Sequence, residues 1–237
     1  MTPEQFAQVI GHTRATVPPT FVIGPVLEAV EELVRGDDLG LDYDRIVHRA
    51  QRIHHLRPCT DRVEVRARTL DVRSFRGNVI GRFSVELHDD AGVVCSALTT
   101  LVQGGAPAAP GKATEAVPLG RVFVDQDLVT RYADASGDHN PIHLDPAAAR
   151  AAGFPGVIAH GMLTAGLALS LVPRDLTWFE AVFTQPVVVG SGVHLDVGAR
   201  AGRDAVEIVV ACDGVAVAHV RTDLSPAALT EWNGSTP

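Results

Sequence analysis

Two stretches of the chain combine an apolar entry with a helical pattern, and each is followed by segments in which apolar and polar residues alternate. The helical stretches are TFVIGPVLEAVEELV, residues 20–34, and PGVIAHGMLTAGLALSLV, residues 155–172. Strands are expected at residues 45–56, 62–72, 78–89 and 93–102, and again at 178–187, 192–201, 205–213 and 215–224. DDAG and CDG supply hairpin turns. The pattern predicts two similar α+β halves, each with one long helix and an antiparallel sheet of about four or five strands.

The two helices differ in how completely they are expected to be buried. From Met162 to Val172 the second helix is apolar on every side, which predicts burial all round. A strongly curved sheet wrapped around this helix would provide that burial. The first helix has a polar face made of Glu28, Glu31, Glu32 and Arg35, opposite Val26, Val30, Leu33 and Val34. We expect this polar face to lie in solvent.

A segment rich in Gly, Ala and Pro, QGGAPAAPGKATEAVP, has no hydrophobic period and separates the two patterns. We predict an N-terminal half at residues 1–104, a linker at 105–118 and a C-terminal half at 119–237. An isolated half would expose a sheet edge and an apolar face, so the two halves are expected to pair within one chain. Such pairing is compatible with a monomer or with a homodimer.

Composition narrows the classes of partner. The 237 residues are 46% hydrophobic, which suffices for a substantial core, and the formal charge of −8 argues against nucleic acid or an anionic membrane surface. No uncharged apolar run is long enough to span a bilayer, and no signal peptide pattern is visible. Three widely spaced cysteines, Cys59, Cys95 and Cys212, favour a reducing compartment over a disulfide framework. We therefore expect a cytoplasmic protein.

The polar chemistry is concentrated in SGDHNPIH, residues 136–143. The helical pattern before it is expected to end at Gly137, and Pro141 cannot continue a helix. A new helix is expected to begin at Asp145, with Asp145 as N-cap and Pro146 at its first position. The sequence thus predicts a stiff, non-helical connection that carries several polar side chains, while Asp145 is assigned to capping.

Two kinds of chemistry can be considered for this connection. His139 and His143 have the spacing of zinc ligands on a helix, but Pro141 breaks the required geometry and no HExxH is present, so no metal is expected. Asp138 and His143 can converge from the two ends of a bent loop and act as an acid/base pair. A buried Asp–His pair that only ties the loop together is an equally good interpretation of the same residues.

A second candidate element is IAHGML, at the start of the apolar helix. His160 and Gly161 lie where backbone N–H groups have no intrahelical partner and the helix dipole adds partial positive charge. Such a place suits a carbonyl oxygen that gains negative charge during a reaction. Taken alone, Gly161 is better explained by close packing.

Taken together, YADASGDHNPIHLDPAAARAAGFPGVIAHGML, residues 132–163, resembles the MaoC-like, or (R)-specific enoyl-thioester hydratase, family. The resemblance rests on a G-D-x-N-P-x-H core followed by A-H-G-M. It implies a hot-dog fold, here doubled, in which an antiparallel sheet wraps a long helix. The implied activity is reversible addition of water to trans-2-enoyl thioesters, which gives (R)-3-hydroxyacyl thioesters. The implied partners are acyl-coenzyme A or acyl-carrier-protein thioesters of fatty acid or polyketide metabolism, with no cofactor.

The resemblance also assigns roles to individual residues. Asp138 and His143 become the catalytic pair around one water, and Asn140 orients that pair. The Gly161 amide, next to His160, becomes the group that holds the thioester oxygen. Because the N-terminal half lacks the signature, the resemblance implies that this half is catalytically silent and lines the acyl tunnel.

Two other functions stay open. Some hot-dog thioesterases place a carboxylate on the central helix, and Glu28 lies on such a helix here, although the solvated-face interpretation suits Glu28 better. A catalytically inert binding subunit is the other alternative. The presence of both Asp138 and His143 favours the hydratase over this inert subunit.

Overall fold

The computed structural model describes residues 2–58, 63–104, 111 and 115–228. The N-terminal half contains α1 (Pro3–Val9), α2 (Ile23–Gly36), η1 (Tyr43–Arg45), β1 (Ile46–His55), β2 (Glu64–Phe75), β3 (Asn78–Asp89) and β4 (Gly92–Gln103). The C-terminal half contains β5 (Val117–Val124), α3 (Gln126–Ser136), η2 (Pro141–His143), α4 (Pro146–Ala151), α5 (Gly161–Ser170), β6 (Trp178–Phe183), β7 (Val193–Ala201), β8 (Val206–Cys212) and β9 (Val215–Thr222). The expected α+β class is confirmed.

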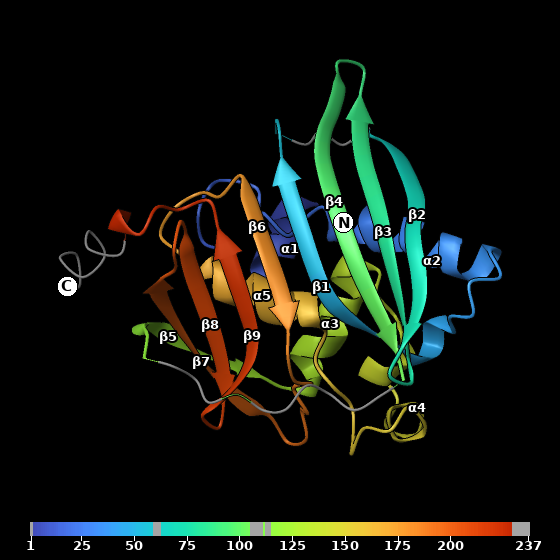
Figure 1. Ribbon diagram of the computed structural model, residues 1–237. Coiled ribbons are helices and arrows are strands. Elements are labelled where there is room, and N and C mark those ends of the chain that lie inside the picture. The colour runs from blue at the N-terminus through green and yellow to red at the C-terminus, as the bar shows by residue number, and fades with distance from the viewer. Residues whose placement is uncertain (1, 59–62, 105–110, 112–114, 229–237) are drawn as a thin grey trace.

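The strands form one nine-stranded antiparallel sheet in the order β2-β3-β4-β1-β6-β9-β8-β7-β5. The long helices lie behind this sheet in Figure 1, so one sheet face covers them and the other faces away. Each half thus consists of a sheet packed on a central helix, α2 in the first and α5 in the second, as the resemblance to the hot-dog fold implies.

Burial of the two central helices agrees with their sequence patterns. In α5 the side chains from Met162 to Leu169 are all buried, as expected for a helix that is apolar on every side. In α2, Val26, Val30 and Val34 are buried, whereas Glu28 is exposed. The predicted solvated face of the first helix is therefore confirmed.

The two halves join through β1 and β6, which pair antiparallel from Ala50 opposite Val182 to His54 opposite Trp178. Hydrogen bonds between these strands make the two half-sheets continuous. The predicted pairing of the halves within one chain is confirmed. This junction also brings β1 of the first half next to the end of β6.

Two elements of the structure were not expected from the pattern. The short helix α1 precedes the first central helix, and it begins with a capping box in which Thr2 accepts from the Gln5 N–H. Strand β5 begins at Val117, inside the range expected to be linker, and it pairs with β7. Residues 105–110 and 112–114 of that range, like Cys59, lie outside the described residues. The division at 1–104, 105–118 and 119–237 stays a prediction.

Within the described part of the chain, no helix is both long enough and apolar enough to cross a membrane. The cytoplasmic location stays a prediction.

Candidate active site

The loop that carries the polar residues is fixed at its start by the end of α3. Asp125 caps the beginning of α3, where its carboxylate accepts from the Leu128 N–H at 2.9 Å. Gly137 ends the helix in the left-handed conformation, at φ 77°, which a residue without Cβ adopts without strain. The chain therefore leaves α3 sharply, and Asp138 is the next residue.

Asn140 and Pro141 hold the middle of this loop. The Asn140 side-chain oxygen accepts from the Ile142 N–H, and its Nδ2 donates to the Tyr43 carbonyl oxygen of the other half at 2.9 Å. Pro141 opens the short 3-10 helix η2, so the prediction of a non-helical connection is wrong for residues 141–143, where the fixed φ of proline suits the first position of a helical turn. Asp145 then caps α4, accepting from the Ala147 N–H at 2.7 Å, as its sequence position predicted.

Three side chains converge at one point between the loop and the start of α5. Asp138, His143 and His160 each place one polar side-chain atom within 4.8 Å of the corresponding atoms of the other two. The His143 and His160 rings lie against each other, with their centroids 3.8 Å apart and their planes inclined by 32°. Both imidazoles are buried and Asp138 is half-buried. The two separate sequence elements that carry Asp138 and His160 thus form one cluster.

Backbone carbonyls determine which nitrogen of each imidazole carries the proton. The His143 Nδ1–H donates to the Ile158 carbonyl at 2.8 Å, which leaves Nε2 as an acceptor. The His160 Nε2–H donates to the Asp138 carbonyl at 3.0 Å, which leaves Nδ1 as an acceptor. His160 Nδ1 and the Tyr132 hydroxyl are buried and have no hydrogen-bond partner within the described residues.

Burial and mutual proximity shift the pKa values of this cluster. Burial lowers the pKa of His143, and it lowers the pKa of His160 to about 3. Burial alone would raise the pKa of Asp138, but His160, His143 and the Asn140 N–H favour its ionised form, and the net pKa is lowered. At neutral pH the cluster therefore holds one carboxylate and two neutral imidazoles.

Gly161 is the first residue of α5, where its N–H has no acceptor within the helix. A Cβ at this position would lie 2.9 Å from two ring carbons of Phe183, which is closer than carbon atoms pack. The close approach of the Phe183 ring supports the packing interpretation, and the role of the Gly161 amide stays a prediction.

The structure separates His139 from the other predicted site residues. Its side chain is exposed, and Nε2 lies 3.2 Å from an Asp134 carboxylate oxygen. The pairing of His139 with His143 as metal ligands is thus absent. A different set, Asp138, His143 and His160, offers three ligand atoms close enough to hold a metal ion. The expectation that no metal is used stays a prediction.

Sequence reasoning missed two residues near the cluster. Tyr132, on α3, received no role from the sequence, and its ring centroid lies 5.0 Å from that of His160. His48 comes from β1 of the half without the signature, and its side chain contacts Phe183. No local pattern in the sequence marks His48, because its place at the site depends on the pairing of β1 with β6.

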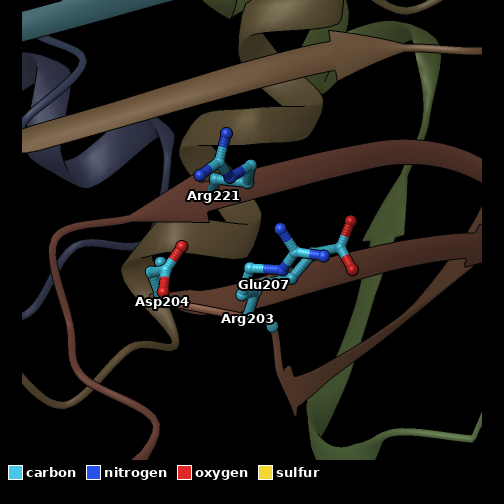
Figure 2. Close-up of a pocket in the computed structure, with 6 residues that line it drawn as sticks. Arg203, Asp204, Glu207 and Arg221 are labelled. Carbon is cyan, nitrogen blue, oxygen red and sulfur yellow. The ribbon is translucent and has the colours of Figure 1, made fainter.

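Two surface hollows lie away from this cluster. One, of about 150 Å³, is at the β7–β8 turn and is lined by Gly202, Arg203, Asp204, Ala205, Glu207 and Arg221 (Figure 2). The other lies on β2 and β3 around Arg66 and Arg68. In the first hollow two arginines face two carboxylates, so it has no strong preference for either sign of charge. Neither hollow contains a residue of the cluster.

The chain is similar to known proteins in sequence. Residues 106–217 match the family model described as MaoC like domain. A protein of Mycobacterium tuberculosis named 3-hydroxyacyl-thioester dehydratase X is 30% identical over 186 residues, covering 73% of this chain and 66% of that protein. A mitochondrial 3-hydroxyacyl-[acyl-carrier-protein] dehydratase of Arabidopsis thaliana is 40% identical over 74 residues, covering 31% and 40%.

Solved structures extend the similarity over nearly the whole chain. The crystal structure of HtdX of Mycobacterium tuberculosis has a TM-score of 0.81 at 26% identity and covers 94% of this chain and 95% of that one. A second protein of that organism, described as having a double hotdog fold, has a TM-score of 0.55 at 16% identity, covering 94% and 85%. The fold is a double hot-dog. The chain belongs to the MaoC-like family, and it spans 66% of the length of the first curated relatives that it matches.

One similarity concerns the thioesterase alternative. An acyl-ACP thioesterase of Bacteroides thetaiotaomicron has a TM-score of 0.54 at 12% identity, which indicates a shared fold alone. The carboxylate considered for that chemistry, Glu28, is exposed on α2. The geometry of α2 therefore gives hydrolysis no support.

Proposed function

We propose that this protein is a hydro-lyase that adds water reversibly to trans-2-enoyl thioesters and gives (R)-3-hydroxyacyl thioesters. The observation that carries the proposal is the state of the cluster: an ionised carboxylate, Asp138, lies beside a neutral imidazole, His143, whose Nδ1 is occupied by the Ile158 carbonyl. Relatives named 3-hydroxyacyl-thioester dehydratase X and 3-hydroxyacyl-[acyl-carrier-protein] dehydratase support the same reaction class.

The cluster suits a single water. Asp138 and His143 Nε2 are both hydrogen-bond acceptors, so one water can donate one hydrogen to each. This orients the oxygen lone pair away from the pair and toward a substrate carbon. A carboxylate and a neutral imidazole do not compete for the same role, since Asp138 fixes the water and His143 takes its proton.

The proposed step balances with His143 as the only proton carrier. His143 Nε2 removes one proton from the water while the oxygen bonds to C3 of the enoyl group. The C2=C3 π electrons move toward the thioester carbonyl, whose oxygen becomes negative. The imidazolium then returns the proton to C2, and His143 is neutral again. Since one residue acts on one face, hydroxyl and hydrogen are added to the same face.

The thioester oxygen needs a donor while it is negative. We assign this role to the Gly161 N–H at the start of α5, where the helix dipole adds positive potential. His160 carries no proton on Nδ1 and is already bonded through Nε2, so it is assigned to support of Asp138 rather than to proton transfer. Asn140 keeps the loop in register through the Tyr43 carbonyl.

The test follows loss of the conjugated enoyl-thioester absorbance with short and long trans-2-enoyl-coenzyme A substrates. Asp138→Asn and His143→Ala are expected to lose about 100- to 10,000-fold in kcat, the range typical of general acid–base catalysis. Asp134→Asn and His139→Ala are matched controls, because they alter an exposed carboxylate and an exposed imidazole of the same region. Chiral analysis of the product tests the (R) configuration.

Several results would contradict the proposal. Release of thiol without hydration would indicate a thioesterase. Equal activity of His143→Ala and wild type would remove His143 as the proton carrier. Folded protein that turns over neither coenzyme A nor acyl-carrier-protein thioesters would indicate an inert binding subunit.

A further inference from the structure

The strand pairing that joins the two halves, between β1 and β6, ends beside a β-bulge in β1. Backbone pairing of β1 with β6 runs from His54 to Ala50 and stops there, with Ala50 opposite Val182. At the same place the register of β1 against β4 shifts between His48 and Ala50, which makes Arg49 the extra residue of a β-bulge. A bulge redirects side chains, and bulges are frequent next to active sites.

Both residues before the end of the ladder turn their side chains to Phe183, the last residue of β6. The Arg49 guanidinium donates to the Phe183 carbonyl oxygen. The His48 ring meets the Phe183 ring in an edge-on arrangement, with centroids 5.4 Å apart and planes inclined by 65°. Arg49 thus binds the Phe183 backbone, and His48 packs against the Phe183 ring.

The Phe183 ring in turn packs next to Gly161, the residue proposed to donate to the thioester oxygen. Two of its ring carbons approach to 2.9 Å from the point where a Cβ of residue 161 would be. The ring therefore fills the space beside the Gly161 backbone, and it is itself buried, with 8% of its surface exposed. Movement of this ring would remove the wall against which the first turn of α5 rests.

His48 is held in its orientation by a buried polar network. His48 Nε2 lies 3.0 Å from Gln51 Oε1, and the same oxygen accepts from the Thr99 hydroxyl at 2.9 Å. Since an amide oxygen only accepts, His48 Nε2 is the protonated nitrogen. Gln51 and Thr99 are fully buried, so this network has one arrangement in which its polar groups are satisfied.

We infer that His48 and Arg49 are positioning residues of the active site, supplied by the half that lacks the catalytic signature, and that they act through Phe183 on the Gly161 amide. The inference rests on the proposed function, and it extends the role of the N-terminal half beyond lining an acyl tunnel. The bulge at Arg49 is what lets two consecutive residues of one strand contact the same residue of its neighbour.

The test is a double-mutant cycle between residues 48 and 183, with Arg49→Met as an independent variant. His48→Ala and Arg49→Met are each expected to lower kcat by about 100-fold, the size of effect that a misplacement of about 1 Å produces. KM is expected to change little, because the affected interaction forms only in the transition state. His48→Phe keeps an aromatic ring against Phe183 and should recover most of kcat.

In the cycle, His48→Ala is expected to cost almost nothing further once Phe183→Leu is present, because the two residues act in series. His54→Ala removes an exposed imidazole from the same strand and is the matched control. Independent effects of the two substitutions, or a His48→Ala variant with wild-type kcat, would overturn the inference.

A readout without turnover distinguishes this inference from the proposed function. The Gly161 amide resonance, followed by ¹H–¹⁵N NMR, should move in His48→Ala and in Arg49→Met and stay in place in His54→Ala. If the wild type hydrates no enoyl thioester but the resonance moves, the reaction is wrong and the positioning is right. If the wild type is active and the resonance stays in place in both variants, the positioning is wrong.

Discussion

Replacement of Gly161 by alanine separates the two roles that this residue can have. The backbone of Gly161 is not in the left-handed region, so alanine fits the local conformation. The added methyl group would lie 2.9 Å from Cδ2 and Cε2 of Phe183 and 3.0 Å from its Cγ. The ring cannot retreat freely, because Arg49 holds the Phe183 backbone and His48 lies against the ring. The start of α5 must therefore shift.

The effects on stability and on activity have different sizes. Overpacking costs about 1–3 kcal/mol, and the better helix propensity of alanine offsets up to about 1 kcal/mol. The free energy of unfolding is thus expected to fall by about 0–3 kcal/mol. Loss of one oxyanion donor lowers kcat by about 100- to 1,000-fold. Gly161→Ala should therefore remain folded at room temperature while it loses nearly all turnover.

The assay combines the enoyl-thioester absorbance with chemical unfolding of the same samples. Gly166→Ala, on the same helix, is the matched control, because its new Cβ would meet Ile10 Cγ2 and Thr20 Oγ1 at 3.3 Å, a tight but adjustable contact. We expect this control to keep its kcat within about threefold. A Gly161→Ala enzyme with near wild-type kcat and a lower free energy of unfolding would show that Gly161 serves packing alone.

Three further predictions concern the same cluster. Asn140→Ala removes the donor to the Tyr43 carbonyl and should lower the free energy of unfolding by about 1–3 kcal/mol, as measured in urea, together with kcat. Because the pKa values of His143 and Asp138 are both lowered, kcat for hydration should be constant through neutral pH and fall only below pH 6.5; an acid limb centred at or above 6.5 would contradict the assignment of His143 as base. His160 has a pKa of about 3 when folded and 6.5 in an unfolded chain, so the unfolded state takes up the proton between these values. Stability should therefore decrease from pH 6.5 toward pH 3, and less steeply in His160→Gln; equal slopes would refute this.

Local signals in the sequence predicted much of the fold. Gly137 ends α3 and Asp145 caps the start of α4, both as predicted. The alternating segment at 78–89 is strand β3 with the same bounds. These features depend on residues that are close in sequence. Strand β5 was missed because its apolar residues are interrupted by Pro118 and Gly120, which are typical of loops.

The candidate site was predictable only for the half that carries the motif. Asp138, His143 and His160 are brought together by one loop and one helix, both marked by the sequence. His48 comes from a strand whose relation to Phe183 arises from pairing across more than half of the chain. A β-bulge at Arg49 has no reliable sequence signal, since it follows from the curvature of the sheet.

The continuous ladder between β1 and β6 has a consequence for how the protein behaves at low concentration. If its two halves were separate polypeptides, they would separate on dilution and lose the contacts at Phe183 and Asn140 together. Here a covalent tether keeps the local concentration of each half about the other in the millimolar range, whatever the amount of protein in the tube. Specific activity should therefore stay constant when the sample is diluted to nanomolar levels. Only cleavage of the chain between the halves would make specific activity depend on protein concentration.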